Sequence, residues 1–258
     1  MASATAASGR TRPRFRIERR DAWWAQPLSV ILFLGSFSVY AFWAAWVNAD
    51  YYVEPYLSPL YSPCIAANCV HQMLPIIGQW WTLSPAFLIL WVPLGFRATC
   101  YYYRKSYYRS FFWSPPACAV PDAAPGYSGE TRFPFIFQNA HRYFFWLILI
   151  VTAFLWWDTF LAFKFPTGFG VGVGSLIFLV NVILLTLYTL SCHSCRHLCG
   201  GGLNLHSAAP LRHRLWMRVS RLNEKHGQYA WYSMLSVALT DMYVRLVATG
   251  TIVDFRIL

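Results

Sequence analysis

Charged residues are scarce in this sequence. They account for 12% of its 258 residues, whereas aromatic residues reach 19% and hydrophobic residues 57%. A soluble globular domain usually has about 25% charged residues, so this chain lacks the polar side chains that would cover a surface in water. The composition therefore argues against an ordinary soluble domain and predicts an integral membrane protein.

Acidic residues are especially few, with 10 Asp and Glu against 21 Lys and Arg, which gives a net charge of +11. In a soluble protein such an excess could indicate nucleic-acid binding. Here the basic residues are spread over three segments that flank long apolar runs. We therefore expect no nucleic-acid partner and interpret the positive charge as a property of membrane loops.

Five apolar stretches are long enough to cross a bilayer, which requires about 20 mostly apolar helical residues. The second stretch contains two prolines, which membrane helices tolerate when neighbouring groups satisfy the freed carbonyls. The sequence predicts an all-α fold, an integral membrane bundle of five transmembrane helices in residues 27–258, after a basic N-terminal arm in residues 1–26. The predicted spans are about 27–47, 80–96, 143–163, 171–190 and 229–250.

Basic residues are unevenly divided between the two sides that five spans would create. The N-terminal arm and the connections after the second and fourth spans hold six Lys or Arg each, whereas the opposite side holds only Lys164 and Arg256. Cytoplasmic loops of membrane proteins are enriched in Lys and Arg, so we expect a cytoplasmic N-terminus. Because residues 1–21 are polar and basic, no cleavable signal peptide is expected, and the first apolar run should remain as a helix.

The seven cysteines divide by predicted compartment. Cys64 and Cys69 fall in an outer loop, where oxidising conditions favour a disulfide. The other five fall on the cytoplasmic side, where metal binding or simple burial is more usual than a disulfide. They are Cys100, Cys118, Cys192, Cys195 and Cys199.

The stretch SCHSCRHLCGGG, residues 191–202, concentrates three cysteines and two histidines. If the fourth helix continues through it, the cysteines form one stripe, and His193 and His197 form a second stripe about 120° away. The following glycines would end that helix. A straight helix cannot direct both stripes at one tetrahedral ion. A two-metal cluster could take thiolates at one metal and imidazoles at the other, the helix could unwind at Cys192, or Cys100 and Cys118 could complete the set.

Residue types alone do not separate a zinc site from an iron–sulfur site in this stretch. Histidine is missing from the centres of all five apolar runs, because His71, His141 and His226 lie at span edges. A membrane-embedded haem with two histidine ligands would need histidines inside the spans. We therefore expect no haem.

Three segments are long and unusual in composition: CYYYRKSYYRSFFWSPPACAVPD, YSGETRFPFIFQNAHRYFFW and TLYTLSCHSCRHLCGG. With them the chain resembles, over nearly its whole length, the membrane-anchor subunit of actinobacterial, especially mycobacterial, succinate dehydrogenase. The resemblance implies a multi-pass protein of the bacterial inner (plasma) membrane that docks the iron–sulfur subunit, assembles with the flavoprotein subunit, and binds lipid and a quinone, either menaquinone or ubiquinone. It also allows a higher oligomer of the complex.

The resemblance further implies an additional Rieske-type [2Fe–2S] centre in this subunit in place of haem. Such a centre has two Cys and two His ligands, and its histidines raise the reduction potential. Which cysteines serve as ligands stays open. The candidates are His193, His197, Cys195, Cys199, Cys192, Cys118 and Cys100.

Two groups of residues are candidates for quinone binding. The cytoplasmic segment CYYYRKSYYRSFFWSPP mixes cations with aromatic residues that can bond a quinone carbonyl, although an interfacial aromatic belt with anionic-lipid contacts would have the same composition. Charged residues inside the spans form the second group. A charge inside a membrane is energetically costly, so such residues either form ion pairs or serve a function. The proximal candidates are Tyr107, Arg109, Trp113, His141 and Arg142, and the distal ones are Asp158, Asp241 and Arg245.

Two other functions are compatible with the sequence. One is a polytopic membrane transporter or sensor with a cytoplasmic Cys/His zinc site. A transporter would show internal repeats or broken helices around a polar site at the midplane, and neither pattern is present. The other is a structural anchor without a redox centre of its own.

Overall fold

The computed structural model describes residues 19–70, 80–123, 131–133 and 135–258. The chain divides into two compact units. The smaller unit is formed by Met1–Phe33 and Lys105–Tyr127, and the larger by Leu34–Arg104 and Ser128–Leu258. Most of the predicted N-terminal arm, residues 1–18, lies outside the described residues.

The described chain is almost entirely helical, as the sequence predicts. Its small strands form two antiparallel hairpins, in which Tyr52 pairs with Leu57 and Lys164 with Phe169. The α-helices are α1 (Ala25–Val47), α2 (Ala86–Thr99), α3 (Tyr101–Phe111), α4 (His141–Leu161), α5 (Val173–Leu190), α6 (His193–Gly200), α7 (Pro210–Glu224) and α8 (His226–Ala248). The other elements are two 3-10 turns, η1 (Phe135–Ala140) and η2 (His206–Ala208), and the strands β1 (Tyr52–Val53), β2 (Tyr56–Leu57), β3 (Lys164–Phe165) and β4 (Gly168–Phe169).

By length and composition, three helical stretches in the described chain can cross a membrane: Ala25–Val47, Phe135–Leu161 and Val173–Leu190. They coincide with the first, third and fourth predicted spans. The second predicted span contains the shorter apolar helix α2, which begins only after Pro85. The fifth corresponds to α8, whose apolar character is interrupted by Asp241 and Arg245. The count of five spans therefore stays a prediction.

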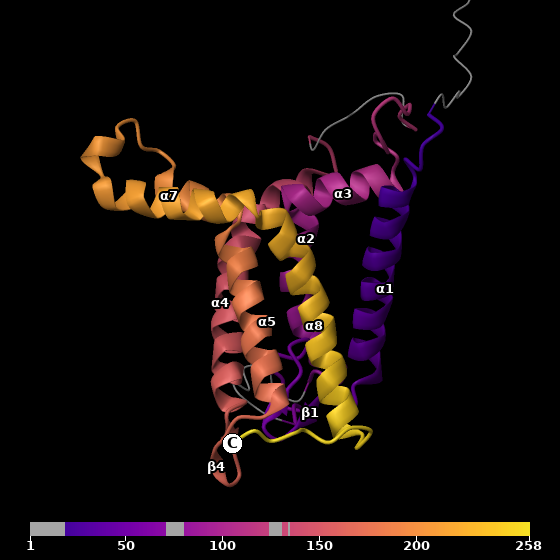
Figure 1. The fold of residues 1–258 in the computed structure, drawn as a ribbon, viewed down its shortest axis with the longest axis vertical. Coiled ribbons are helices and arrows are strands. Elements are labelled where there is room, and N and C mark those ends of the chain that lie inside the picture. Colours follow the sequence, from indigo (N-terminus) through magenta and orange to yellow (C-terminus); the bar gives the residue numbers. More distant parts are fainter. Residues whose placement is uncertain (1–18, 71–79, 124–130, 134) are drawn as a thin grey trace, which may run out of the picture. The chain divides into compact units, whose positions relative to one another are not determined.

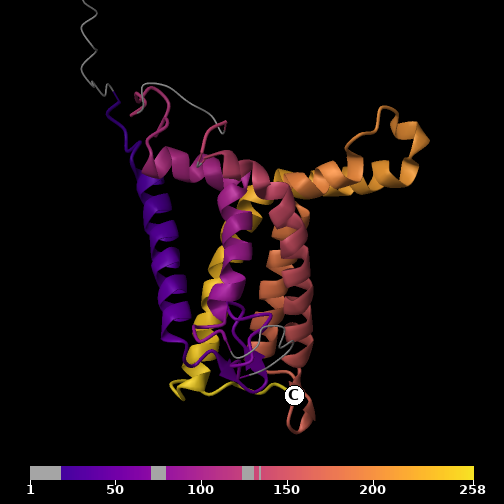
Figure 2. The ribbon, with the colours of Figure 1, turned by 180° about the vertical axis from the view of Figure 1, so that it is seen from behind.

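In the larger unit α2, α4, α5 and α8 pack along one another, as Figures 1 and 2 show from opposite sides. Polar side chains link these apolar helices. The Trp156 indole donates to Thr186 at 2.9 Å between α4 and α5, and the Ser236 hydroxyl donates to Asn181 at 2.7 Å between α8 and α5. Hydrogen bonds of this kind join helices where the apolar effect alone would not fix their contacts.

The described part of the segment between α1 and α2, which contains β1 and β2, packs against the ends of the larger unit's helices that lie opposite to α7 (Figure 1). Tyr51 and Tyr61 stack in parallel there, with ring centroids 4.0 Å apart. The predicted disulfide between Cys64 and Cys69 is present, with the Cα atoms 6.0 Å apart. Both sulfurs are buried in this apolar cluster.

The fourth predicted span does not continue as one straight helix. Helix α5 ends at Leu190, and the backbone leaves helical geometry at Cys192, which is extended. The Cys192 sulfur accepts a hydrogen bond from the Ser194 backbone N–H. Of the alternatives for this stretch, unwinding at Cys192 is therefore the one found. As predicted, the glycines after Cys199 end the helix: α6 stops at Gly200, and Gly202 has a φ of +73°.

Candidate metal centre

Two cysteines and two histidines meet in the larger unit near the ends of its long helices. The Nε2 of His141 lies 2.9 Å from the Sγ of Cys192, and the Nε2 of His226 lies 3.4 Å from the Sγ of Cys100. Cys100 follows α2, Cys192 follows α5, and the two histidines are the first residues of α4 and α8. Each donor therefore comes from a helix end, where a break in the helix directs it inward.

The other nitrogen of each imidazole is bound by a hydroxyl. The Thr99 hydroxyl donates its hydrogen to the carbonyl four residues earlier in α2, at 2.7 Å, so it accepts from the Nδ1–H of His141 at 2.9 Å. The Ser191 hydroxyl donates to the carbonyl three residues earlier, at 3.0 Å, and so accepts from the Nδ1–H of His226 at 2.8 Å. Both histidines are thereby held as the tautomer whose Nε2 lone pair faces a cysteine sulfur.

The two halves of this cluster have the same plan. A hydroxyl residue directly precedes each cysteine, and each histidine bonds the hydroxyl of one Thr–Cys or Ser–Cys pair and the sulfur of the other. Each imidazole also stacks on an aromatic ring: His141 on Phe96 at 4.8 Å and His226 on Tyr188 at 5.1 Å. The rings are fixed in orientation before any ligand is present.

Burial sets the chemistry of the thiols. Cys100 is 3% exposed and Cys192 is 1% exposed. Burial raises the pKa of the Cys192 thiol to about 12, and the nearby Cys100 acts in the same direction, while the Ser194 backbone N–H opposes it. Without a metal the Cys192 thiol stays protonated at neutral pH, and its S–H group can donate to the Nε2 of His141. A bound metal would replace that proton.

The four donors match the ligand set of a Rieske-type centre, which takes two Cys and two His. Their Nδ1 hydrogen bonds are of the kind that orients histidines at metal sites. In the part of the chain that the structure describes, no group of three or more His, Cys, Asp or Glu is placed for a single metal ion. The described donors form two Cys–His pairs, His141 with Cys192 and His226 with Cys100, and two Cys with two His is also a ligand set of zinc.

The other predicted ligands lie elsewhere. His193 and His197 are exposed on α6. On the same helix Cys195 is buried, and its pKa is raised to about 11 by burial, with Cys199 adding to the effect. Cys118 is exposed and belongs to the smaller unit. The structure thus brings the candidates Cys100 and Cys192 together with His141 and His226, and the metal-binding role of all the predicted ligands stays a prediction.

Sequence reasoning assigned His141 to a quinone pocket and His226 only to a span edge. A signal for both was nevertheless present. A hydroxyl residue precedes Cys100 and Cys192 directly after an apolar run, and a histidine lies at the start of the third and fifth runs. These four positions share the side that carries the basic loops, so the predicted topology already placed them at one membrane face.

The proximal quinone candidates fall in both units. Tyr107, Arg109 and Trp113 belong to the smaller unit, where the Trp113 ring meets Trp23 edge to face at 5.6 Å. His141 and Arg142 belong to the larger unit, and Arg142 is exposed. A shared quinone pocket formed by all five stays a prediction.

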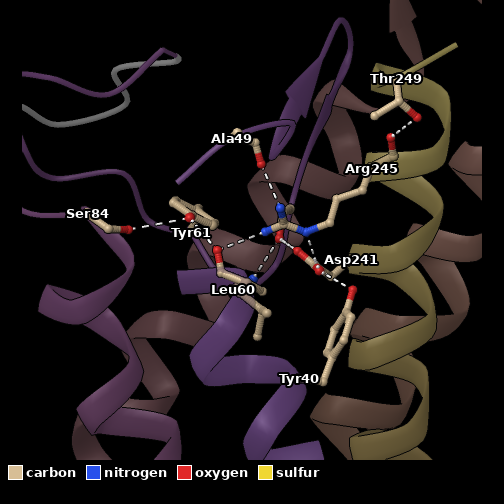
Figure 3. A network of polar contacts seen from close by, with 10 residues as sticks. Tyr40, Ala49, Leu60, Tyr61, Ser84, Asp241, Arg245 and Thr249 are labelled. Atoms are coloured by element: carbon tan, nitrogen blue, oxygen red, sulfur yellow. Dashed lines mark hydrogen bonds and ion pairs between the residues drawn. The ribbon is translucent and has the colours of Figure 1, made fainter. Parts of the chain in front are cut away.

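The distal candidates Asp241 and Arg245 form the predicted i, i+4 ion pair on α8, at 2.8 Å. Figure 3 shows the network around them. Asp241 also accepts hydrogen bonds from the Tyr40 and Ser58 hydroxyls. The remaining Arg245 nitrogens donate to the carbonyls of Ala49 and Ala44, at 2.6 and 3.2 Å. Every charge here is partnered, which indicates a structural network that ties α8 to α1 and to the segment after it.

Asp158, the third distal candidate, has a different environment. It is 3% exposed in α4, and its carboxyl oxygens have no hydrogen-bond partner among the described residues. The structure does not join it to the Asp241–Arg245 pair. A distal quinone site formed by these three residues stays a prediction.

Comparison with known proteins decides the family. A family model described as "Actinobacterial succinate dehydrogenase subunit SdhC" matches residues 25–250. The chain belongs to this family. It is therefore a membrane-anchor subunit of succinate dehydrogenase, a multi-pass protein of the bacterial inner membrane, as the resemblance implied.

A solved structure supports the same family. A chain of the "Mycobacterium smegmatis Sdh1 complex in the apo form" is 45% identical, with a TM-score of 0.88, over 97% of this chain and 98% of that one. No curated protein matches detectably. The family's fold therefore extends over nearly the whole chain, including the helix ends that carry Cys100, His141, Cys192 and His226.

Proposed function

We propose that this subunit passes electrons from the iron–sulfur subunit of succinate dehydrogenase to membrane quinone, through a Rieske-type [2Fe–2S] centre held by Cys100, Cys192, His141 and His226. When bound, such a centre would accept and release single electrons, and its histidine ligands would raise its potential. The observation that carries the proposal is the presentation of two thiols and two Nε2 lone pairs at one buried place.

The chain's own contribution is orientation and exclusion of water. Thr99 and Ser191 hold the imidazole tautomers, Phe96 and Tyr188 hold the ring planes, and burial keeps solvent from the thiols. Hydrogen bonds to ligating histidines and the apolar shell around a site both tune metal affinity and potential. The geometry is therefore arranged for a redox centre in a dry environment.

The proposal includes the predicted topology of five spans with a cytoplasmic N-terminus. α2 and α8 would be the second and fifth spans, and the cluster would then lie near the cytoplasmic face. The distribution of Lys and Arg supports this orientation. It would place the cluster on the side where the iron–sulfur and flavoprotein subunits bind, with quinone entering from the lipid.

The test compares two pairs of histidines in the purified complex. Replacing His141 or His226 by Ala should abolish the EPR signal of the [2Fe–2S] centre and quinone reduction. Succinate oxidation with a soluble electron acceptor should persist, since that reaction precedes the anchor. The matched controls are His193→Ala and His197→Ala, which remove exposed imidazoles and should retain the signal.

Each other outcome has a definite meaning. Loss of the signal only in the His193 or His197 variants would assign the ligands to α6 instead. Zinc without iron in the wild-type subunit would assign the four donors to a zinc site and refute the redox role. Neither metal, with quinone still reduced, would leave an anchor without a redox centre.

A further inference from the structure

Arg97 is a cation close to the proposed cluster. Its side chain extends from the last turn of α2 and lies over the ring of Tyr188, with the guanidinium carbon 4.7 Å from the ring centroid. The ring of the proposed ligand His226 also stacks on Tyr188, with the ring centroids 5.1 Å apart. Tyr188 is 1% exposed, so water is excluded from the ring that both groups contact, and charges interact more strongly where the dielectric is low.

The guanidinium of Arg97 is held in place by neutral groups. It donates to the Tyr103 hydroxyl at 2.6 Å, to the Ala230 carbonyl at 3.1 Å and to the Ser233 hydroxyl at 3.1 Å. No carboxylate within ion-pair distance of it is found in residues 19–70, 80–123, 131–133 and 135–258. Its positive charge is therefore not neutralised locally, in contrast to that of Arg245.

We infer that Arg97 is a positioning residue that raises the reduction potential of the cluster. This inference rests on the proposed function. A [2Fe–2S] centre with two thiolates and two neutral imidazoles carries no net charge when oxidised, and the electron that reduces it adds one negative charge. A fixed cation in a medium of low dielectric stabilises that added charge, and local charge and hydrogen bonding set the potentials of such centres.

The experiment is a redox titration of the cluster by EPR in the whole complex. Arg97→Met removes the charge and should shift the midpoint potential to a more negative value, whereas Arg97→Lys keeps the charge and should retain most of the wild-type value. The matched control is Arg256→Met, which removes a cation lying over the ring of Phe165, beyond the end of α8 that is remote from His226, and should leave the midpoint unchanged.

A second variant keeps the test valid if Arg97→Met does not assemble. Tyr103→Phe with Ser233→Ala removes two hydrogen bonds that fix the guanidinium but keeps the charge, and should give a smaller negative shift. The inference is overturned if the cluster signal persists with an unchanged midpoint potential in Arg97→Met and in the Tyr103→Phe, Ser233→Ala double variant. It is also overturned if Arg97→Lys lowers the midpoint potential as far as Arg97→Met does. Absence of any cluster signal in the wild-type complex would instead refute the proposed function.

Discussion

The Nε2 of His141 lies 2.9 Å from the Sγ of Cys192, although 51 residues separate them in the chain. The hydroxyl of Thr99 holds the opposite side of the same imidazole. This contact joins the beginning of α4 to the end of α5 and, through Thr99, to the end of α2. It is half of a cluster whose second half, around His226 and Cys100, repeats the arrangement.

The Thr99 and Ser191 hydroxyls that bond the histidines should affect metal affinity nearly as much as the proposed ligands do. Thr99→Val removes the acceptor for the Nδ1–H of His141, so the imidazole loses its fixed tautomer and orientation. Changes of this kind typically lower metal affinity by about 10- to 100-fold. We expect less iron per complex after dialysis against a chelator, measured by metal analysis.

Thr152→Val is the matched control for that change. Thr152 is 8% exposed and Thr99 9% exposed, and each hydroxyl donates at 2.7 Å to the carbonyl four residues earlier in its own helix. Equal iron loss in Thr99→Val and Thr152→Val would show that the loss comes from a general change in the helices and not from the altered His141 imidazole.

The Asp241–Arg245 network should contribute mainly to stability. Arg245→Met leaves the Asp241 carboxylate buried without its cation, which typically destabilises a protein by about 3–5 kcal/mol. The double variant Asp241→Asn with Arg245→Met has no isolated charge and should recover much of this loss. Thermal unfolding of the purified complex measures both effects.

Arg256→Met is the control for that network, because Arg256 is exposed and contacts the ring of Phe165. A change of less than about 0.5 kcal/mol is expected. If the double variant is less stable than Arg245→Met alone, the pair has a role beyond charge balance.

Two exposed positions give a test of orientation. A cysteine introduced by Val253→Cys, at a position that is 90% exposed after α8, should react with a membrane-impermeant maleimide only from the periplasmic side. The exposed thiol of Cys118 should react from the cytoplasmic side. Peptide mass spectrometry of right-side-out and inverted vesicles identifies which cysteines carry the label. The reverse labelling pattern would overturn the predicted topology.

The sequence was sufficient for the helical fold and for the positions of the long apolar helices, because long apolar runs have few alternatives to helix in a membrane. It also predicted the Asp241–Arg245 pair from an i, i+4 spacing. These features depend on neighbours along the chain.

The proposed ligand set could not be predicted in the same way. The spacing of His193 and His197 describes only the faces of one helix, whereas the two Cys–His contacts join residues from four helix ends. The pairing of His141 with Cys192 depends on how α4 and α5 pack, which no local pattern specifies.

The distribution of the four donors along the chain also bears on biogenesis. Residues 100, 141, 192 and 226 leave the ribosome in that order, and the last of them opens the final long helix. A cluster that needs all four donors could not be inserted into a partly synthesised subunit. Binding of iron would then indicate that the whole polypeptide has been synthesised and inserted into the membrane. A chain truncated before α8 would remain without the cluster.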